Sequence, residues 1–429
     1  MKYSAALFII LNSLQSIEGN ENGLARSPPL GWRSWNLFGG NVNQDLIQGI
    51  MKGMADRSRT VNGVQTSLID LGYSDVGLDD NWQVCTDGHY HDDQGRPVVN
   101  TTIFPSMKNM TDYAHSLGLT AGFYGNNCIC SDASIGDKKF YQGDVDAFVE
   151  FGFDSWKLDG CGAQTDLELW DQLLSAAGKK VVVENCHWGS REPYEPEIRD
   201  GNLWCPWNFY RTSGDISAHY DSIMSNLETV TKYAENNLSV PGCWAYPDML
   251  EVGVGDLSFN EWRTHFAAWA IVSSPLILSH DVNDQALMNT IWPIISNTEV
   301  IAVNQKYVDM SGQKFFQSNA KVKLGKNWAA QRTDEIEVLD DLHLSEQVFY
   351  FKNLGDDGIA ILLINNAEKS ASISLDLKTV PGVSCSSSCA LRDIYEHKDL
   401  GNFDLADKSV FTQQVESHDS LFLVITNEE

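Results

Sequence analysis

The stretch Ser155 to Cys161, Ser-Trp-Lys-Leu-Asp-Gly-Cys, places a lysine and an aspartate two residues apart at the end of an apolar run. Side chains alternate along a strand, so Lys157 and Asp159 are expected to point to the same side, just before the turn at Gly160. A neighbouring ammonium keeps a carboxylate ionised, and an ionised carboxylate can act as a covalent nucleophile. An ordinary structural ion pair is the alternative for this stretch taken alone.

A second carboxylate, Asp215, follows the segment Arg211-Thr212-Ser213-Gly214. Two carboxylates suit glycoside hydrolysis, in which one attacks the anomeric carbon and the other protonates the leaving oxygen. We expect Lys157 to hold Asp159 ionised, and negative Asp159 to raise the pKa of Asp215 so that Asp215 starts protonated. Once Asp159 is glycosylated, Asp215 would become more acidic and act as a base, without any metal or cofactor. A helix N-cap is the alternative role for Asp215.

Both carboxylates need a scaffold that brings strand ends together. Apolar runs predict strands at 30–35, 73–78, 119–124, 155–159 and 180–184, and less clearly at 203–209, 239–244 and 275–279, with helical patterns between them. Such alternation implies parallel strands joined by crossover helices, either in a barrel or in an open sheet. In a barrel all strand ends converge on one pocket, which the open sheet does not achieve. The sequence therefore predicts an α/β fold, a (β/α)8 TIM barrel, from the polar residues at successive strand ends: Trp35, Asp79, Asp80, Tyr124, Lys157 and Asp159.

The pattern changes in the last third of the chain. At 429 residues the chain is too long for one core of typical size. Short strands expected at 347–351, 358–364, 371–377 and 420–425 follow one another without helical periodicity, which predicts a C-terminal antiparallel β-sandwich. We therefore place a signal peptide at 1–19, the catalytic barrel at 20–312 and the β domain at 313–429.

The first residues and the composition indicate a secreted or lumenal protein. Lys2, a short apolar core and small residues form a secretory signal, and no other long uncharged run would span a membrane. We expect the extracellular space or a lysosomal or vacuolar lumen. The net charge of −28 disfavours nucleic acid as a partner. Three sequons are candidate glycosylation sites: Asn100, Asn109 and Asn237.

Nine cysteines leave at least one thiol unpaired within a monomer. In an oxidising lumen some of the others should be bridged. Cys385 and Cys389 are placed to close a small local loop. The spacing of Cys128 and Cys130 matches no zinc ribbon, so we expect no metal site.

Several motifs follow one another in an order that is specific as a set. They are residues 23–35, Leu78-Asp79-Asp80-Asn81-Trp82, Gly122-Phe123-Tyr124, Trp156-Lys157-Leu158-Asp159-Gly160-Cys161, Arg211 with Asp215, and Pro247-Asp248-Met249-Leu250. With them the chain resembles the melibiase family of retaining α-galactosidases and α-N-acetylgalactosaminidases, glycoside hydrolase family 27. The resemblance implies Asp159 as nucleophile and Asp215 as acid/base. It implies substrate contacts for Trp35, Asp79, Asp80, Tyr124, Lys157, His187, Arg211 and Asp248. It also implies one disulfide from Cys161 to Cys128 or Cys130 and another between Cys186 and Cys205.

Some residues depart from the family pattern near the sugar's 2-position. His187 stands where α-galactosidases usually have glutamate and acetylgalactosaminidases a small residue. A histidine can bond a 2-hydroxyl and leaves little room for an acetamido group, which favours galactose; a structural histidine is the alternative. Ala245-Tyr246 also replaces the usual Asn-Asp before Pro247.

The predicted function is a retaining exo-glycosidase that removes terminal α-D-galactosyl residues from oligosaccharides or glycoconjugates. Two alternatives keep the scaffold and the chemistry: an α-N-acetylgalactosaminidase and a β-L-arabinopyranosidase. A third alternative is a sugar-binding protein without catalytic activity. A homodimer is left open.

Overall fold

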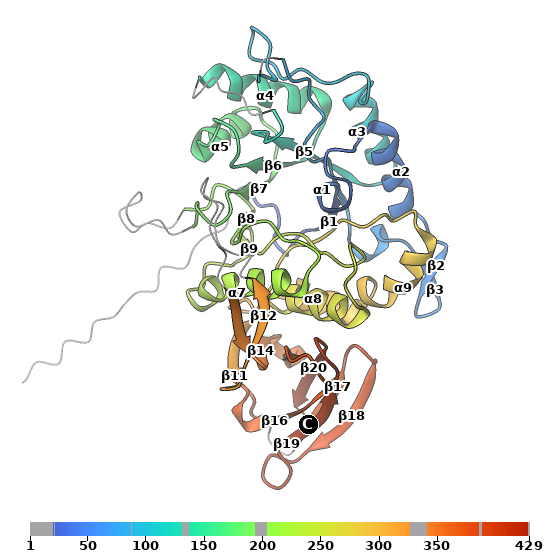
Figure 1. The fold of residues 1–429 in the computed structure, drawn as a ribbon, viewed down its shortest axis with the longest axis vertical. Coiled ribbons are helices and arrows are strands. Elements are labelled where there is room, and N and C mark those ends of the chain that lie inside the picture. The colour runs from blue at the N-terminus through green and yellow to red at the C-terminus, as the bar shows by residue number, and fades with distance from the viewer. Residues whose placement is uncertain are drawn as a thin grey trace, which may run out of the picture.

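A barrel and a β domain make up the chain. The computed structural model describes residues 20, 22–86, 88–130, 137–193, 204–326, 341–385 and 388–427, and the expected signal peptide at 1–19 lies outside these ranges. In Figure 1 the barrel runs from blue to yellow, and the β domain follows below it in orange and red. The predicted fold class is confirmed: an eight-stranded parallel sheet precedes a set of antiparallel sheets.

The barrel sheet has the strand order β10-β1-β4-β5-β6-β7-β8-β9. Beyond the end of β9, the backbone N–H of Leu250 donates to the carbonyl of Ile277 at 2.8 Å and joins the two outer strands. Because all eight strands are parallel, their carboxyl ends lie on one face. The strands are β1 (Leu30–Arg33), β4 (Asp75–Gly77), β5 (Thr120–Gly125), β6 (Ser155–Asp159), β7 (Val182–Cys186), β8 (Phe209–Arg211), β9 (Trp244–Tyr246) and β10 (Leu276–Leu278).

Helices cover the outside of this sheet. In α2 (Gln44–Met54), the side chain of Asn43 accepts from the N–H of Leu46 and caps the helix, and Ile47, Ile50, Met51 and Met54 form its buried stripe. The other barrel helices are α1 (Trp35–Phe38), α3 (Met107–Ser116), α4 (Lys138–Phe151), α5 (Leu167–Ala176), α7 (Tyr220–Glu235), α8 (Phe259–Ile271), α9 (Gln285–Ile295) and α10 (Thr298–Gln305). A hairpin of β2 (Arg59–Val61) and β3 (Val64–Thr66) projects beside them.

Two late strands begin further along the chain than the sequence predicted. The expected strands at 203–209 and 239–244 are β8 and β9, which begin at Phe209 and Trp244. The apolar residues before them serve a loop core instead: Trp207 is fully buried, and Val240 and Cys243 exchange backbone hydrogen bonds across a tight turn. These buried loop residues therefore produced the apolar pattern from which longer strands were predicted.

The C-terminal part is a β-sandwich. A six-stranded sheet has the order β11-β14-β15-β20-β17-β18, and two further antiparallel pairs, β12–β13 and β16–β19, accompany it. Its strands are β11 (Gln313–Gln317), β12 (Lys321–Lys326), β13 (Asp341–Ser345), β14 (Gln347–Asn353), β15 (Ile359–Asn365), β16 (Ala371–Asp376), β17 (Cys389–Asp393), β18 (Lys398–Phe403), β19 (Val410–Val415) and β20 (Ser420–Asn427). We keep the boundary at 312 and 313 as a proposal.

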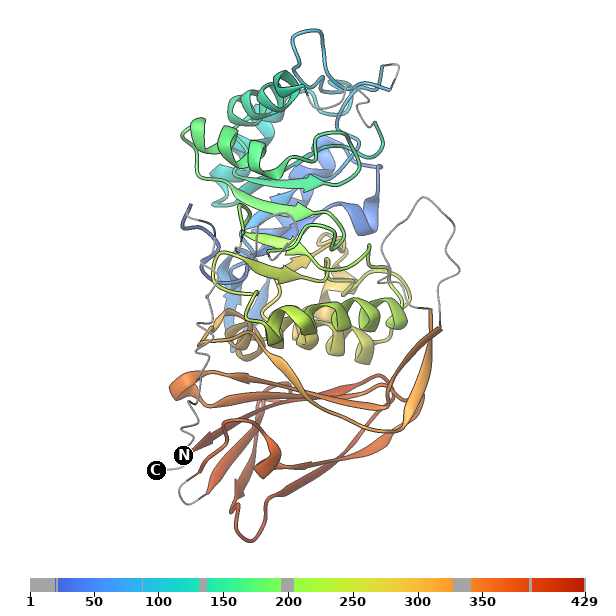
Figure 2. The same ribbon diagram turned by 90° about the vertical axis from the view of Figure 1, so that its left-hand side faces the viewer.

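Alternate side chains of β15 serve two cores. Ile361 and Leu363 pack inside the sandwich, whereas Ala360, Leu362 and Ile364 belong to the core that is continuous with the barrel helices. Such alternation is the period of a strand buried on both faces. In Figure 2 the helices α7 and α8 lie between the barrel strands and the orange and red strands.

Helix α8 is buried on both sides. Towards the β domain, Thr264 donates to the carbonyl of His418 at 3.0 Å, and Tyr395 donates its hydroxyl to the carbonyl of Arg263 at 2.6 Å. Towards the barrel, the indole N–H of Trp269 donates to the carbonyl of Asp248 at 2.7 Å. The helix therefore connects the β domain to the loop after β9. Within the described ranges, no helix is both long enough and apolar enough to cross a bilayer.

Candidate active site

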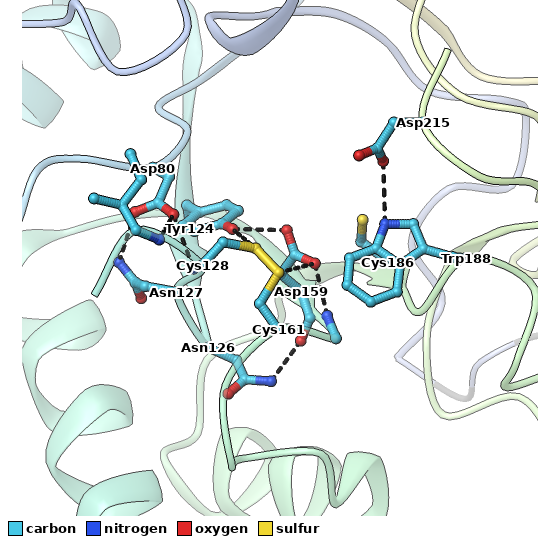
Figure 3. The surroundings of a disulfide bond; sticks show 12 residues. Asp80, Tyr124, Asn126, Asn127, Cys128, Asp159, Cys161, Cys186, Trp188 and Asp215 are labelled. Carbon is cyan, nitrogen blue, oxygen red and sulfur yellow. Dashed lines mark hydrogen bonds between the residues drawn. A yellow bond between two sulfur atoms is a disulfide. The ribbon is translucent and has the colours of Figure 1, made fainter. Parts of the chain in front are cut away.

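Asp159 ends β6 at the carboxyl face of the barrel. Its side chain is 5% exposed and both of its oxygens are held. The hydroxyl of Tyr124, on β5, donates to Oδ2 at 2.6 Å, and the backbone N–H of Gly160 donates to Oδ1 at 2.7 Å. The amide of Asn126 donates to the backbone carbonyl of Asp159 at 2.6 Å (Figure 3). The carboxylate is therefore fixed in place by its neighbours.

Lys157 points to the same side of β6 as Asp159, as the sequence predicted, but its partner is a different carboxylate. Its Nζ lies 2.9 Å from Oδ2 of Asp79, and it sits over the ring of Tyr124 at 5.3 Å from the centroid. Asp79, just beyond β4, is buried with it. A buried ammonium and carboxylate paired in this way present fixed polar groups to a ligand at the strand ends.

Asp80 holds a loop. Its Oδ2 accepts from the backbone N–H groups of Cys128 and Ile129 at 2.9 and 2.8 Å, and its Oδ1 accepts from Gln83 at 2.8 Å. Figure 3 shows this carboxylate turned towards the loop that carries Asn127 and Cys128. Its two oxygens therefore already serve protein donors, and Asp80 supports the wall of the site next to Asp159.

A second cluster of charges surrounds Arg211, the last residue of β8. Its Nη2 lies 3.0 Å from Oδ1 of Asp215 and 2.8 Å from Oδ2 of Asp248. Asp248 is buried and also accepts from the N–H of Ile216 at 2.9 Å. The side chain of Asp215 is 52% exposed, so it stands at the mouth of the site. Helix α7 begins only at Tyr220 with His219 as its N-cap, so the alternative role of Asp215 as a helix cap does not hold.

The turn after β7 contributes a tryptophan between the two carboxylates. The indole N–H of Trp188 donates to Oδ1 of Asp215 at 3.1 Å, and Figure 3 places the ring between Asp159 and Asp215. His187 is turned inward instead: it is 5% exposed, its Nδ1 bonds Oδ1 of Asn185 at 2.8 Å, and burial lowers its pKa to about 4. The structural alternative for His187 therefore has a definite partner, which is the side chain of Asn185.

The expected distribution of protons between Asp159 and Asp215 is wrong. Burial raises the pKa of Asp159 to about 6, against the opposing effects of Lys157 and of the Tyr124 hydrogen bond. For Asp215, desolvation favours the neutral form, but the charges of Arg211 and Lys157 and the hydrogen bonds from Arg211 and Trp188 outweigh it and lower the pKa. The physical reason is the pairing: Lys157 binds Asp79 directly, while Arg211 binds Asp215.

One group of side chains within the described ranges has the spacing of metal ligands. It consists of Asp159, Cys128 and Cys161. The two sulfurs are joined in a disulfide, so neither offers a thiolate to a metal. This group therefore gives no metal-binding site.

Comparison with known proteins shows the family of the chain. The family model described as "Alpha galactosidase A" matches residues 27–306, and the model described as "Alpha galactosidase C-terminal beta sandwich domain" matches residues 345–425. The chain belongs to this family of glycoside hydrolases. The resemblance drawn from the sequence motifs, and the prediction that the protein is a glycoside hydrolase, are thereby confirmed.

Individual relatives of this glycoside hydrolase cover most of its length. An alpha-galactosidase of Cyamopsis tetragonoloba is 31% identical over 388 residues, covering 88% of this chain and 82% of the relative. An alpha-galactosidase of Oryza sativa subsp. japonica is 30% identical over 414 residues, covering 95% and 86%. The crystal structure of alpha-galactosidase I from Mortierella vinacea has a TM-score of 0.76 at 26% identity, covering 95% of this chain and 99% of that one.

The disulfides of the glycoside hydrolase correct one prediction. Cys161 is bonded to Cys128, one of its two expected partners, and Cys385 is bonded to Cys389 as predicted. The expected bond between Cys186 and Cys205 is wrong. Cys205 is bonded to Cys243 because the turn before β9 returns to the loop before β8, and Cys186 is a buried free thiol on β7. Cys130 is bonded to Cys85.

The barrel of the hydrolase gathers most of the predicted site residues at one face. Trp35 lies in α1 directly after β1, partly buried against a cluster that includes Trp244 and Met249. Trp188 is a site residue that the sequence did not predict, although it directly follows His187. The available signal was the large aromatic residue before Gly189, at a strand end, where a turn can present it to the pocket.

Proposed function

We propose that this protein is a retaining exo-glycosidase that hydrolyses terminal α-D-galactosyl residues. The pair of carboxylates at the ends of β6 and β8 carries the proposal: Asp159 is buried and fixed by Tyr124 and Gly160, whereas Asp215 stands half exposed at the mouth. Asp159 attacks the anomeric carbon while Asp215 gives its proton to the leaving oxygen, and a glycosyl ester forms on Asp159. Asp215 then takes a proton from the water that cleaves the ester.

The substrate contacts are proposed for the groups that surround these carboxylates. Lys157 and Asp79 form a fixed pair of a donor and an acceptor for sugar hydroxyls, and Trp35 supplies an apolar wall. Arg211 and Asp248 hold the segment that carries Asp215. We keep Asp80 and His187 as proposed contacts. His187 reaches a 2-hydroxyl only if the sugar or a small shift of the turn uncovers its Nε2, which is buried without a hydrogen-bond partner in the described residues.

The proton balance predicts an acidic pH optimum. The pKa of Asp159 is raised to about 6 and that of Asp215 is lowered, so when the two carboxylates hold one proton between them, Asp159 is its favoured position. The productive form carries the same proton on Asp215, so it exists only while the pair keeps one proton. Activity should therefore fall as the pH rises above about 6, where the pair loses that proton, and fall again where Asp215 and Asp159 are both protonated.

Hydrolysis of p-nitrophenyl α-D-galactoside at mildly acidic pH tests the proposal. The 2-acetamido counterpart and p-nitrophenyl β-L-arabinopyranoside are measured beside it. Preference for the galactoside supports the proposed function. Preference for either other glycoside keeps the chemistry but overturns the proposed sugar, and no turnover of any of the three together with sugar binding supports the inactive binding protein. Retention of configuration is read from the first-formed anomer by NMR.

The surroundings of the enzyme in the cell also stay proposals. We propose entry into the secretory route and glycosylation at the three sequons. The side chain of Asn109 is exposed, whereas Asn100 and Asn237 are partly buried. Treatment with an N-glycosidase followed by mass spectrometry tests the sequons, and light scattering tests whether the enzyme forms a homodimer.

A further inference from the structure

The turn that follows β7 reaches the proposed acid/base residue through a single side chain. The indole N–H of Trp188 donates to Oδ1 of Asp215 at 3.1 Å (Figure 3). Nη2 of Arg211 donates to the same oxygen at 3.0 Å. Within the described ranges, Oδ2 of Asp215 accepts no hydrogen bond. Two donors on one oxygen leave the other as the place for a proton. The geometry therefore distinguishes the two oxygens of this carboxylate.

The turn itself is held from several directions. Asn185 accepts from Nδ1 of His187 at 2.8 Å and donates to the carbonyl of Arg191 at 3.1 Å. Ser190 donates to the carbonyl of His187 through both its N–H, at 2.8 Å, and its hydroxyl, at 2.6 Å. These bonds close the turn around Trp188 and leave its backbone little freedom. The indole is therefore presented from a rigid base.

The turn also packs directly against the segment that carries Asp215. Gly189 has a φ of +81°, and a Cβ added there would lie 2.8 Å from the backbone oxygen of Thr212. The close approach requires glycine, both for space and for the left-handed backbone. Thr212 stands three residues before Asp215 in the same segment. Contact between the two backbones fixes the position of the Trp188 indole relative to the Asp215 carboxylate.

Trp188 has a left-handed backbone that aromatic residues seldom adopt. Its φ is +49°. Such conformations persist where the surroundings enforce them, and they are common at functional sites. The ring lies against Gly160, the residue after Asp159: a Cβ on Gly160 would be 3.0 Å from the indole. Trp188 thus touches the loop of one proposed catalytic carboxylate and bonds the other.

We propose that Trp188 is a positioning residue for proton donation, which holds Oδ1 of Asp215 so that Oδ2 carries the proton to the leaving oxygen. This inference rests on the proposed function, because it takes Asp215 as the acid/base. A donor to the carboxylate also favours its ionised form. Trp188 therefore sets both the orientation of Asp215 and its affinity for the proton.

Trp188→Phe tests the inference because it keeps an aromatic side chain in the turn and removes the indole N–H that donates to Asp215. Trp292→Phe is the matched control: its indole N–H donates to the carbonyl of Thr60, also at 3.1 Å, on α9 and far from the site. Both variants are compared on a dinitrophenyl α-galactoside, which needs little acid assistance, and on an alkyl α-galactoside, which needs much. The pH dependence of kcat/KM is measured for each.

We expect Trp188→Phe to lose about tenfold in kcat/KM on the alkyl galactoside and little on the dinitrophenyl galactoside, a part of the hundredfold or more that a positioned general acid supplies. Its acidic limb should move to higher pH, since the carboxylate has lost a donor. Trp292→Phe should change neither. Equal losses on both substrates with an unmoved limb would overturn the inference, because a merely structural tryptophan behaves in that way.

Two further variants separate the possible failures. Asp215→Asn should lose far more on the alkyl galactoside than on the dinitrophenyl one; if it loses nothing, the proposed function fails, and the role of Trp188 fails with it. If Asp215→Asn behaves as expected and Trp188→Phe does not, only the inference on Trp188 fails. Should Trp188→Phe not fold, Ser190→Ala loosens the same turn at an exposed residue and should give a smaller loss of the same kind.

Discussion

Tyr124→Phe probes the proposed nucleophile by removing one oxygen atom. The hydroxyl of Tyr124 donates to Oδ2 of Asp159 at 2.6 Å, and both side chains are buried. Phenylalanine keeps the ring under Nζ of Lys157 and the apolar packing of β5. The change therefore removes the hydrogen bond to the carboxylate of Asp159 and a weaker contact with Sγ of Cys128 at 3.4 Å.

The size of the effect follows from that bond. A hydrogen bond to a charged group contributes about 1.5–3 kcal/mol, and 1.36 kcal/mol corresponds to a factor of ten in an equilibrium. Without the hydroxyl, the pKa of Asp159 should rise further above its value of about 6. The proton of the pair then stays more firmly on Asp159, and the productive form becomes rarer. We expect kcat/KM to fall by about tenfold to about a hundredfold.

The assay is the pH dependence of kcat/KM on p-nitrophenyl α-D-galactoside. The alkaline limb, which reports loss of the proton from the pair, should move to higher pH in Tyr124→Phe. Tyr210→Phe is the control, since it removes a buried hydroxyl that donates to the carbonyl of Leu238 at 2.9 Å on β8. It should cost some stability and leave both limbs in place. A Tyr124→Phe enzyme with normal kcat/KM and an unmoved alkaline limb would refute the proton balance proposed for the site.

Three other predictions concern Asp159, the free thiol and a buried lysine. Asp159→Asn should abolish turnover and keep galactose binding in calorimetry, whereas equal loss of both would make Asp159 a structural residue. Peptide mapping without reduction should find Cys205 bonded to Cys243, and Cys186 should react with a thiol reagent only after unfolding, because it is buried and burial raises its pKa. Lys352 is fully buried, and desolvation lowers its pKa to about 7 from 10.5. The unfolded chain therefore binds more protons between these values, so the free energy of unfolding should rise with pH from about 7 to about 10.5, and Lys352→Met should flatten this rise in denaturant titrations.

The barrel could be predicted because its signals are local. Strand β6 is an apolar run that ends at Gly160, and α2 shows a regular buried stripe, so periodicity alone locates both. The polar residues at the strand ends then select a barrel, since only a barrel brings them together. The bounds of short strands such as β8 and β9 were predicted wrongly, because three residues give almost no periodicity. The buried loop residues before them have the same apolar pattern as a strand.

The electrostatics of the site could not be predicted in the same way. The alternation of β6 puts Lys157 beside Asp159, but its ammonium instead bonds Asp79 from the next strand but one. Which of several carboxylates receives a lysine depends on distances across the barrel, which the sequence does not contain. The pairing of Cys205 with Cys243 has the same origin, because it depends on how two loops return towards each other.

Because helix α8 packs against both domains, the boundary between them in the sequence does not separate two units that fold independently. One side of it bonds strands of the sandwich through Thr264 and Arg263, and the other side holds the carbonyl of Asp248 through Trp269. A shortened chain that ends at residue 312 would expose the first side to water and leave Thr264 without its partners. The barrel and the sandwich should accordingly melt in a single cooperative transition, and the truncated chain should be an unstable protein with a disturbed Asp248 loop, not a smaller enzyme.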